Sequence, residues 1–333
     1  MPLTGPTPLP ISTVTVMLVT VLYRCEGYLE RYFQSLARQT DQDFALIAID
    51  NASPDKSASV CEQLATRYGI RVLVQKCGAN LGVAEGNNVG LRLALSHNLE
   101  HIVLSNNDID LPDDTIARIR SEVIDRRIPV WAPKALYGDS STYWYAGGFM
   151  ADLRGRSIHT SQAQAVALGE LAPYSVTYAP TCFMYVHADV FRRVGIMDKN
   201  YFVYHDDTDF SKRLQRADIP IRYDPTLVYR HYVGSSSGGD LSPFFLTIST
   251  RNKFYYIRKH FHGPKYYAAL LIGVAGKAIQ LLMPSRAKPT WKGLRDARRL
   301  VGEHRDELRA GTCGGERELD SAAPGEAVYV NWN

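Results

Sequence analysis

The chain has 333 residues, enough for one large or two modest domains, and its 45% hydrophobic and 22% charged residues are ordinary for a soluble globular protein. The net charge of +4 is unevenly placed, because residues 251–310 contain 14 Lys or Arg and only 4 Asp or Glu. A basic C-terminal region on a mildly acidic body favours an anionic surface as partner, either membrane or nucleic acid, over a basic substrate.

The cysteines and the N-terminus bear on the compartment. The cysteines are odd in number and lack paired C-x-x-C spacing, which indicates a reducing compartment and no structural zinc site. Residues 1–12 contain several prolines but no Lys or Arg, so we expect an N-terminal arm and not a signal peptide. The cysteines are Cys25, Cys61, Cys77, Cys182 and Cys313.

Strand-like and helical segments alternate over roughly the first 130 residues. The strand-like runs are apolar and rich in β-branched residues, as expected for strands buried on both faces. Alternation at this pitch specifies right-handed βαβ crossovers, so we predict an α/β fold with a Rossmann-like, mostly parallel central sheet flanked by helices. The predicted strands are 13–23, 44–49, 71–74 and 101–105, and the helices that follow the first three are 29–40, 56–68 and 82–95.

The first strand does not lead into a dinucleotide-binding turn. It ends in Tyr23-Arg24-Cys25-Glu26-Gly27, without the G-x-G-x-x-G pattern. Asp50 at the end of the second strand does not discriminate, because dinucleotide-binding enzymes also carry an acid there. The missing glycines argue against a dehydrogenase.

The end of the fourth strand combines amides and a carboxylate. The strand 101–105 is followed directly by Asn106, Asn107 and Asp108. Open α/β sheets bind ligands at the carboxyl ends of their strands, and oxygen ligands there suit a divalent cation that carries a phosphorylated ligand. The same residue types also make turns into helices, so these residues alone leave both interpretations open.

The pattern changes after Pro129. Residues 150–172 show no clear period, and we expect the least structured part of the chain there. We predict a mixed or antiparallel extension of the sheet, on which the acceptor side of a site is built. The strand-like pieces are 130–136, 143–149, 175–179 and 184–187.

Three carboxylates within four positions open a helix that is predicted to run to Ala217. They are Asp206, Asp207 and Asp209, and they follow an aromatic run. Acids at a helix N-terminus are favoured by the free N–H groups and the dipole, but capping needs one acid or two. Three acids exceed what capping needs, which indicates that these carboxylates take part in a reaction. Further along, His231 precedes a Gly/Ser-rich loop over 232–239, which is able to close over a ligand.

The C-terminal region predicts membrane-surface helices. Residues 266–283 are apolar except for Lys277, which argues against a membrane span, so we expect a helix that lies on the surface. An amphipathic helix is predicted over 288–309. The alternative is that both helices pack on the catalytic body or on another subunit. The flanking basic residues are Lys265, Arg286, Lys288 and Lys292.

Seven segments, in this order, resemble family 2 of the inverting glycosyltransferases, which have the GT-A fold, and in particular its bacterial rhamnosyl- and galactofuranosyltransferase-like members. The resemblance covers about residues 14–262. The segments are 19–23 (VTVLY), 49–55 (IDNASPD), 80–90 (NLGVAEGNNVG), 105–108 (SNND), 204–210 (YHDDTDF), 231–235 (HYVGS) and 251–253 (RNK).

The resemblance implies roles for individual residues. Asp108 takes the metal-binding place of the family's D-x-D motif, whose first position is Asn106 here, so whether Asn106 ligates the metal stays open. His231 falls where some relatives supply a further metal ligand. Asp207 matches the catalytic base, with Asp206 as its neighbour. The implied nucleotide-sugar-binding residues are Thr20, Tyr23, Asp50, Asn51, Ser53, Asn80, Gly82, Asn87, Asn106 and Asn107.

The implied function is an inverting, Mn²⁺- or Mg²⁺-dependent transfer of a sugar from a nucleotide donor, dTDP-rhamnose or UDP-galactofuranose, to a glycan or polyprenyl-diphosphate-linked acceptor. We expect a cytoplasmic protein, peripheral on the inner face of the cell membrane through residues 244–309, with no nucleic-acid partner and a possible homo-oligomer. The alternative is a non-catalytic glycan or nucleotide binder with a decayed metal site. A nucleotidyltransferase has no role for Asp206 and Asp207.

The expected domain organisation has four parts. They are an arm (1–12), a catalytic domain (13–240) with a nucleotide-sugar half (13–130) and an acceptor and base half (131–240), a helical basic extension (241–310) and a loose tail (311–333).

Overall fold

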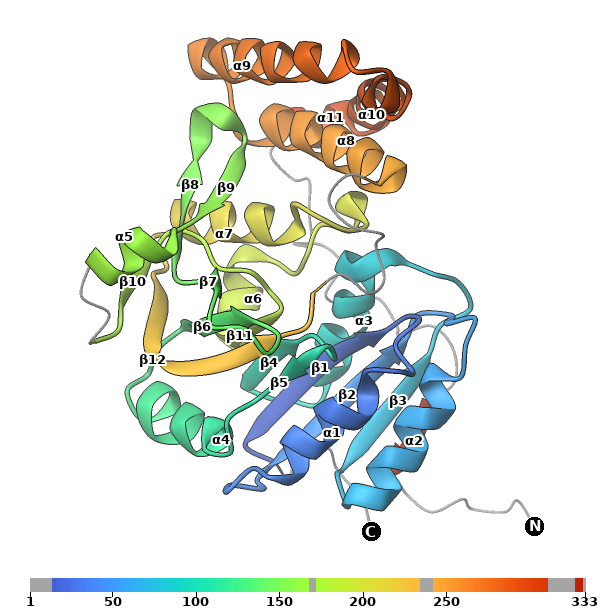
Figure 1. The fold of residues 1–333 in the computed structure, drawn as a ribbon, viewed down its shortest axis with the longest axis vertical. Coiled ribbons are helices and arrows are strands. Elements are labelled where there is room, and N and C mark those ends of the chain that lie inside the picture. The colour runs from blue at the N-terminus through green and yellow to red at the C-terminus, as the bar shows by residue number, and fades with distance from the viewer. Residues whose placement is uncertain (1–13, 168–171, 234–241, 311–326, 332–333) are drawn as a thin grey trace.

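The computed structural model describes residues 14–167, 172–233, 242–310 and 327–331, which form a central sheet covered by helices with a helical layer at one end (Figure 1). The strands are β1 (Val16–Leu22), β2 (Phe44–Asp50), β3 (Val72–Lys76), β4 (His101–Ser105), β5 (Ile109–Asp110), β6 (Val130–Tyr137), β7 (Tyr143–Tyr145), β8 (Gly148–Ala151), β9 (Arg156–His159), β10 (Tyr174–Val176), β11 (Phe183–His187), β12 (Ile221–His231) and β13 (Ala327–Val330). The helices are α1 (Leu29–Ala37), α2 (Ser57–Tyr68), α3 (Gly82–Ser96), α4 (Thr115–Arg118), α5 (Gln162–Ala167), α6 (Ala188–Val194), α7 (Asp206–Arg216), α8 (Pro243–His260), α9 (Gly263–Leu281), α10 (Pro284–Glu303) and α11 (Arg305–Ala310).

The central sheet confirms the predicted fold class. Its order is β10-β12-β6-β11-β4-β1-β2-β3-β13. Strands β3, β2, β1 and β4 are parallel neighbours, as the βαβ alternation predicts. Beyond β4 the sheet is mixed, because β11 runs antiparallel between β4 and β6. The carboxyl ends of β1, β2 and β4 therefore meet at one edge of the sheet.

Helix α3 packs unusually close to β1. A Cβ atom at Gly90 would lie 2.3 Å from Cγ1 of Val19, and one at Gly86 would lie 2.9 Å from Cγ1 of Val21. Both contacts are too short for any side chain larger than hydrogen. The glycines of the 80–90 segment thus let the helix lie directly on the strand, which fixes the position of its N-terminus at the edge of the sheet.

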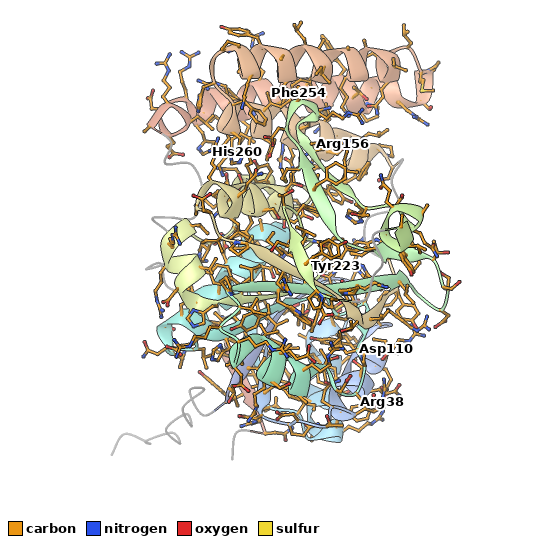
Figure 2. All side chains as sticks on the ribbon, turned by 90° about the vertical axis from the view of Figure 1, so that its left-hand side faces the viewer. Arg38, Asp110, Arg156, Tyr223, Phe254 and His260 are labelled. Carbon is orange, nitrogen blue, oxygen red and sulfur yellow. The ribbon has the colours of Figure 1, made fainter. Side chains whose placement is uncertain are left out.

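The region 150–172 is more ordered than its sequence predicts. Strands β8 and β9 form a separate antiparallel hairpin, and α5 follows them. The expected single strand over 143–149 is split at Gly147, whose φ of +84° breaks it into β7 and β8. The hairpin extends from the sheet to the C-terminal helices, where Figure 2 shows Arg156 beside Phe254. Residues 168–171 lie outside the described residues.

The C-terminal helices form a layer over α7 and the hairpin, with α9 at the outer edge (Figure 1). A second apolar cluster, which includes Tyr201, Tyr255, Tyr256 and Phe261, joins this layer to the body. The expectation of a loose tail is wrong for residues 327–330, because β13 pairs antiparallel with β3 at the edge of the sheet. Residues 311–326 lie outside the described residues.

Candidate active site

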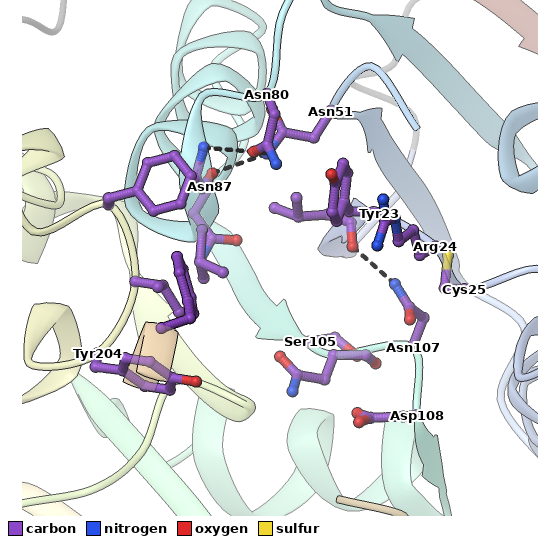
Figure 3. A pocket seen from close by; sticks show the side chains of 17 residues that line it. Tyr23, Arg24, Cys25, Asn51, Asn80, Asn87, Ser105, Asn107, Asp108 and Tyr204 are labelled. Atoms are coloured by element: carbon purple, nitrogen blue, oxygen red, sulfur yellow. Dashed lines mark hydrogen bonds between the residues drawn. The ribbon is translucent and has the colours of Figure 1, made fainter. Parts of the chain in front are cut away.

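A cleft opens at the carboxyl ends of β1, β2 and β4, where the predicted nucleotide and metal residues converge (Figure 3). Tyr204 lies across it from Asn107 and Asp108. Several lining residues were not predicted from the sequence as site residues, namely Arg24, Cys25, Val83, Phe202, Val203 and Phe244. The predicted residues that line the cleft are Tyr23, Asn51, Asn80, Gly82, Asn87, Asn106, Asn107 and Asp108.

Asn51 and Gly82 build the wall of the cleft at the N-terminus of α3. The Asn51 amide donates to Oδ1 of Asn80 at 3.0 Å and to the Gly82 carbonyl at 3.0 Å, and its Oδ1 accepts from the Leu81 N–H at 2.8 Å. Gly82 has a φ of +81°, and a Cβ there would lie 2.4 Å from the Phe202 carbonyl oxygen. The first N–H groups of α3 are therefore satisfied within the protein, and the segment before α7 is held against them.

Thr20, Asp50 and Ser53 lie outside the cleft lining. The Asn107 amide reaches back to Oγ1 of Thr20 at 3.3 Å and to the Val21 carbonyl at 2.8 Å, so these groups tie β4 to β1. The Ser53 N–H donates to Asp50 at 3.1 Å, and Ser53 Oγ accepts from the N–H of Arg24 at 2.8 Å. These residues shape the turns that line the cleft.

Asp108, Asn106 and His231 meet at the bottom of the cleft. Oδ1 of Asp108 lies 3.1 Å from Nε2 of His231, and the Asn106 amide nitrogen lies 3.3 Å from the same ring atom. The two residues of β5 pair with the last two residues of β12, and this pairing brings His231 beside Asp108. Carboxylate, amide and imidazole groups are donors that fit a divalent cation such as Mn²⁺. Within the described ranges there is no group of three or more His, Cys, Asp or Glu able to hold a metal ion. A cation here would therefore also draw on Asn106, water or the diphosphate.

The two acids at the start of α7 have different environments. Burial, followed by the charge of Asp207, raises the pKa of Asp206 to about 8, so Asp206 carries a proton at neutral pH. Asp207 is half-buried, and its Oδ2 accepts a hydrogen bond from the Tyr178 hydroxyl at 2.6 Å. Burial, followed by the charge of Asp207, keeps the pKa of Tyr178 well above its usual value, so the phenol remains a donor.

A row of aromatic rings connects the two ends of the site. The ring of His231 lies 4.3 Å from that of Trp144, Trp144 lies 5.2 Å from His159, and His159 lies 5.6 Å from Tyr178, all measured between ring centroids. Tyr178 in turn holds Asp207. A chain of packed rings therefore joins the Asp108–His231 pair to the carboxylate of Asp207, whereas His231 and Asp207 themselves are not among the residues that line the cleft.

Asp209, the third acid, is structural. Its carboxylate is fully buried and accepts from Arg213 at 2.8 Å, Lys259 at 2.6 Å, His260 at 2.8 Å and Tyr201 at 3.2 Å. Burial alone raises the pKa of Asp209, but the charges of Lys259 and Arg213 outweigh it and hold this pKa well below the usual range. The ion pairs with α8 fix the start of α7, and with it Asp207.

The mixed sheet has its cleft at the carboxyl ends of the parallel strands, with Asp108 in the cleft and Asp207 at the start of α7. This arrangement is that of a glycosyltransferase of the GT-A fold. Residues 17–194 match the sequence profile of "Glycosyl transferase family 2", and the chain belongs to this family. The dTDP-rhamnosyl transferase RfbF of Shigella flexneri is 22% identical over 66% of this chain and 73% of its own length. The N-acetylglucosaminyl-diphospho-decaprenol L-rhamnosyltransferase of Mycobacterium tuberculosis is 25% identical over 68% of this chain and 79% of its own.

Solved structures share the fold at low sequence identity. The crystal structure of GalNAc-T7 with UDP, GalNAc and Mn²⁺ matches 90% of this chain with a TM-score of 0.60 and 13% identity. This chain spans 58% of the length of that one.

Proposed function

We propose that this glycosyltransferase moves L-rhamnose from dTDP-rhamnose to a glycan or polyprenyl-diphosphate-linked acceptor, with inversion at the anomeric carbon. UDP-galactofuranose is the alternative donor. The observation that carries the proposal is the chain of packed rings that joins Asp108 with His231 to Asp207 with Tyr178. The relatives from Shigella flexneri and Mycobacterium tuberculosis are both rhamnosyltransferases, which favours rhamnose.

Asp207 is the proposed base. An acceptor hydroxyl is a poor nucleophile, and a carboxylate within hydrogen-bond reach takes its proton as the oxygen attacks the anomeric carbon. The bond to the nucleotide diphosphate breaks on the opposite face, so a single displacement inverts that carbon. Tyr178 orients Asp207 by donating to Oδ2, and the Thr208 N–H donates to Oδ1 at 2.6 Å, so both carboxylate oxygens are held in place and each keeps a further lone pair for the acceptor. Protonated Asp206 adds no second negative charge beside it.

The leaving diphosphate needs positive charge near its oxygens. Asp108 and His231, with Asn106 beside them, would hold Mn²⁺ or Mg²⁺, which supplies that charge when bound. The Mn²⁺ in the GalNAc-T7 structure supports this assignment. The amide and backbone groups of the α3 wall line the cleft where the nucleoside is expected.

A thermal-shift panel tests the donor and the metal together. We expect dTDP-rhamnose with Mn²⁺ to raise the melting temperature more than other nucleotide sugars, because a ligand that binds only the folded state stabilises it. Asp108→Asn should lose the metal-dependent part of the shift. Asp110→Asn, two residues away and paired with Arg38, is the matched control and should keep it. If no nucleotide sugar raises the melting temperature of the wild type with either metal, the proposal is wrong.

The outer face of α9 supports attachment to a membrane surface. No helix among the described residues is long and apolar enough to span a bilayer. The outward-facing side of α9 is nevertheless apolar: Leu271 is 70% exposed, and Leu282, which directly follows the helix, is 84% exposed. Trp291 of α10 is 66% exposed. Lys277, the one charged residue between Lys265 and Arg286, is half-buried on the inner side. Such a face with basic flanks fits the interface of an anionic membrane.

The double variant Leu271→Asp, Leu282→Asp should bind vesicles that contain phosphatidylglycerol at least about tenfold more weakly than the wild type, because two charges enter the apolar interface. Co-sedimentation with vesicles measures this. Val166→Asp replaces an apolar residue of similar exposure on α5 and is the control. Absence of vesicle binding by the wild type would contradict attachment to the membrane. A dimer in solution that the double variant dissociates would show that another subunit covers this face.

A further inference from the structure

Three cationic side chains from three elements converge between the body and α9. Arg156 begins β9 at the tip of the hairpin, Lys253 lies in the middle of α8, and Lys277 lies on α9. The tip packs directly on α8, because a Cβ atom at Gly155 would lie 2.8 Å from Cγ1 of Ile257 and 3.8 Å from Cε of Lys253. Figure 2 shows Arg156 where the hairpin meets the helical layer.

These cations lack acidic partners. Among the described residues, none of the three forms a salt bridge with a carboxylate; Lys277 donates to the neutral side chain of Gln280 at 3.1 Å. Burial, followed by the charge of Arg156, lowers the pKa of Lys253, and burial, followed by the charge of Lys253, lowers the pKa of Lys277 to about 8. The three groups therefore repel one another, and a bound anion would relieve that repulsion.

Strand β9 and helix α9 connect the cluster to the start of α7 and to the apolar face of α9. On one side, Oγ of Ser157, next to Arg156, lies 3.1 Å from Oγ1 of Thr208, which follows Asp207. On the other side, Lys277 belongs to the helix whose outer face is apolar. An extended molecule that passes from Asp207 to the membrane surface would meet a hydroxyl-binding end, then a cationic group, then an apolar surface.

We propose that Arg156, Lys253 and Lys277 bind the diphosphate of a polyprenyl-diphosphate-linked sugar acceptor. This rests on the proposed function and names its acceptor class. The sugar lies at Asp207, the diphosphate lies at the cluster, and the polyprenyl chain lies along α9 in the membrane surface. Two lysines and an arginine complement the two negative charges of a diphosphate diester, and the half-burial of Lys253 and Lys277 strengthens their charge-assisted hydrogen bonds.

Binding of farnesyl diphosphate in EDTA tests the cluster without relying on catalysis. Calorimetry should give a Kd at least about tenfold higher for the double variant Lys253→Gln, Lys277→Gln than for the wild type, as expected when two phosphate contacts are lost. The exposed Arg156→Gln should weaken binding in the same direction, which keeps the test decisive if the double variant folds poorly. Lys56→Gln, which removes an exposed lysine at the start of α2, should leave the Kd unchanged.

Two acceptors separate this proposal from the function on which it rests. With N-acetylglucosaminyl diphosphate on a farnesyl chain, the double variant should show a KM at least about tenfold higher than the wild type. With the octyl glycoside of the same sugar, which lacks the diphosphate, its KM should match that of the wild type. If the wild type transfers sugar to neither acceptor, the proposed function is wrong. If the variants bind farnesyl diphosphate as tightly as the wild type, or if dihexanoyl phosphatidylglycerol competes equally well for the cluster, the diphosphate site is wrong.

Discussion

Asp207→Asn lowers kcat about 10²–10⁴-fold while leaving donor binding intact, since positioned general bases contribute rate factors of this size. The amide keeps the size of the side chain, and its single oxygen can keep one of the two hydrogen bonds that Asp207 accepts from Tyr178 and from the Thr208 N–H. What it loses is the ability to take a proton from the acceptor. Single-turnover transfer assays and calorimetry with the nucleotide sugar measure the two quantities separately.

Asp218→Asn is the matched control for this variant. Asp218 follows the C-terminal end of the same helix, at the opposite end from Asp207, and is exposed. Its transfer rate should equal that of the wild type. Full activity of Asp207→Asn with the correct acceptor would show that Asp207 is not the base. If the affinity for the nucleotide sugar fell by the same factor as the transfer rate, Asp207 would instead be a donor-binding residue.

Asp209→Asn destabilises the protein by about 3–5 kcal/mol, because it leaves the buried cation of Arg213 without its carboxylate and leaves Lys259 with Asp198 alone. Urea unfolding measures this change in free energy. The same Asp218→Asn variant should shift the free energy by less than about 0.5 kcal/mol, as exposed substitutions do.

The pH dependence of this effect has a definite sign. The pKa of Asp209 is lower in the folded state than its ordinary value of 3.8, so its contribution is present above about pH 4 and is lost as the pH falls through the folded-state value. The difference between wild type and Asp209→Asn should therefore be constant from about pH 5 to 8 and shrink only in strong acid. A difference that instead grew on acidification would contradict the buried ion pairs.

The fold was predictable where strands are buried on both faces. β1, β2 and β4 are almost uninterrupted apolar runs, so their strand character and parallel order follow from the sequence. The hairpin β8–β9 was not predictable, because its strands have four residues each and are only partly buried, and so carry no clear alternation. β13 is equally short, and its pairing with β3 depends on contacts more than 250 residues apart.

The site was predictable where it coincides with local motifs. Asn106, Asp108 and Asp207 lie in segments that resemble the family, whereas Trp144 and Tyr178, which connect His231 to Asp207, do not. These aromatic residues come from or follow short strands of the second half, and only tertiary packing brings their rings together. The resemblance also could not separate residues that face a ligand from residues with a structural role. The side-chain amides of Asn51 and Asn107 donate hydrogen bonds to groups at the start of α3 and on β1, respectively.

The configuration of the transferred sugar tests most directly whether Asp207 and a diphosphate at Asp108 act across one cleft. Wild-type protein is incubated with dTDP-rhamnose, Mn²⁺ and N-acetylglucosaminyl diphosphate on a farnesyl chain, and the anomeric proton of the product is followed by NMR. A single displacement predicts the anomer opposite to that of the donor, formed at the rate at which dTDP is released. A product with the donor's own configuration would require a nucleophile in place of a base and would contradict this arrangement.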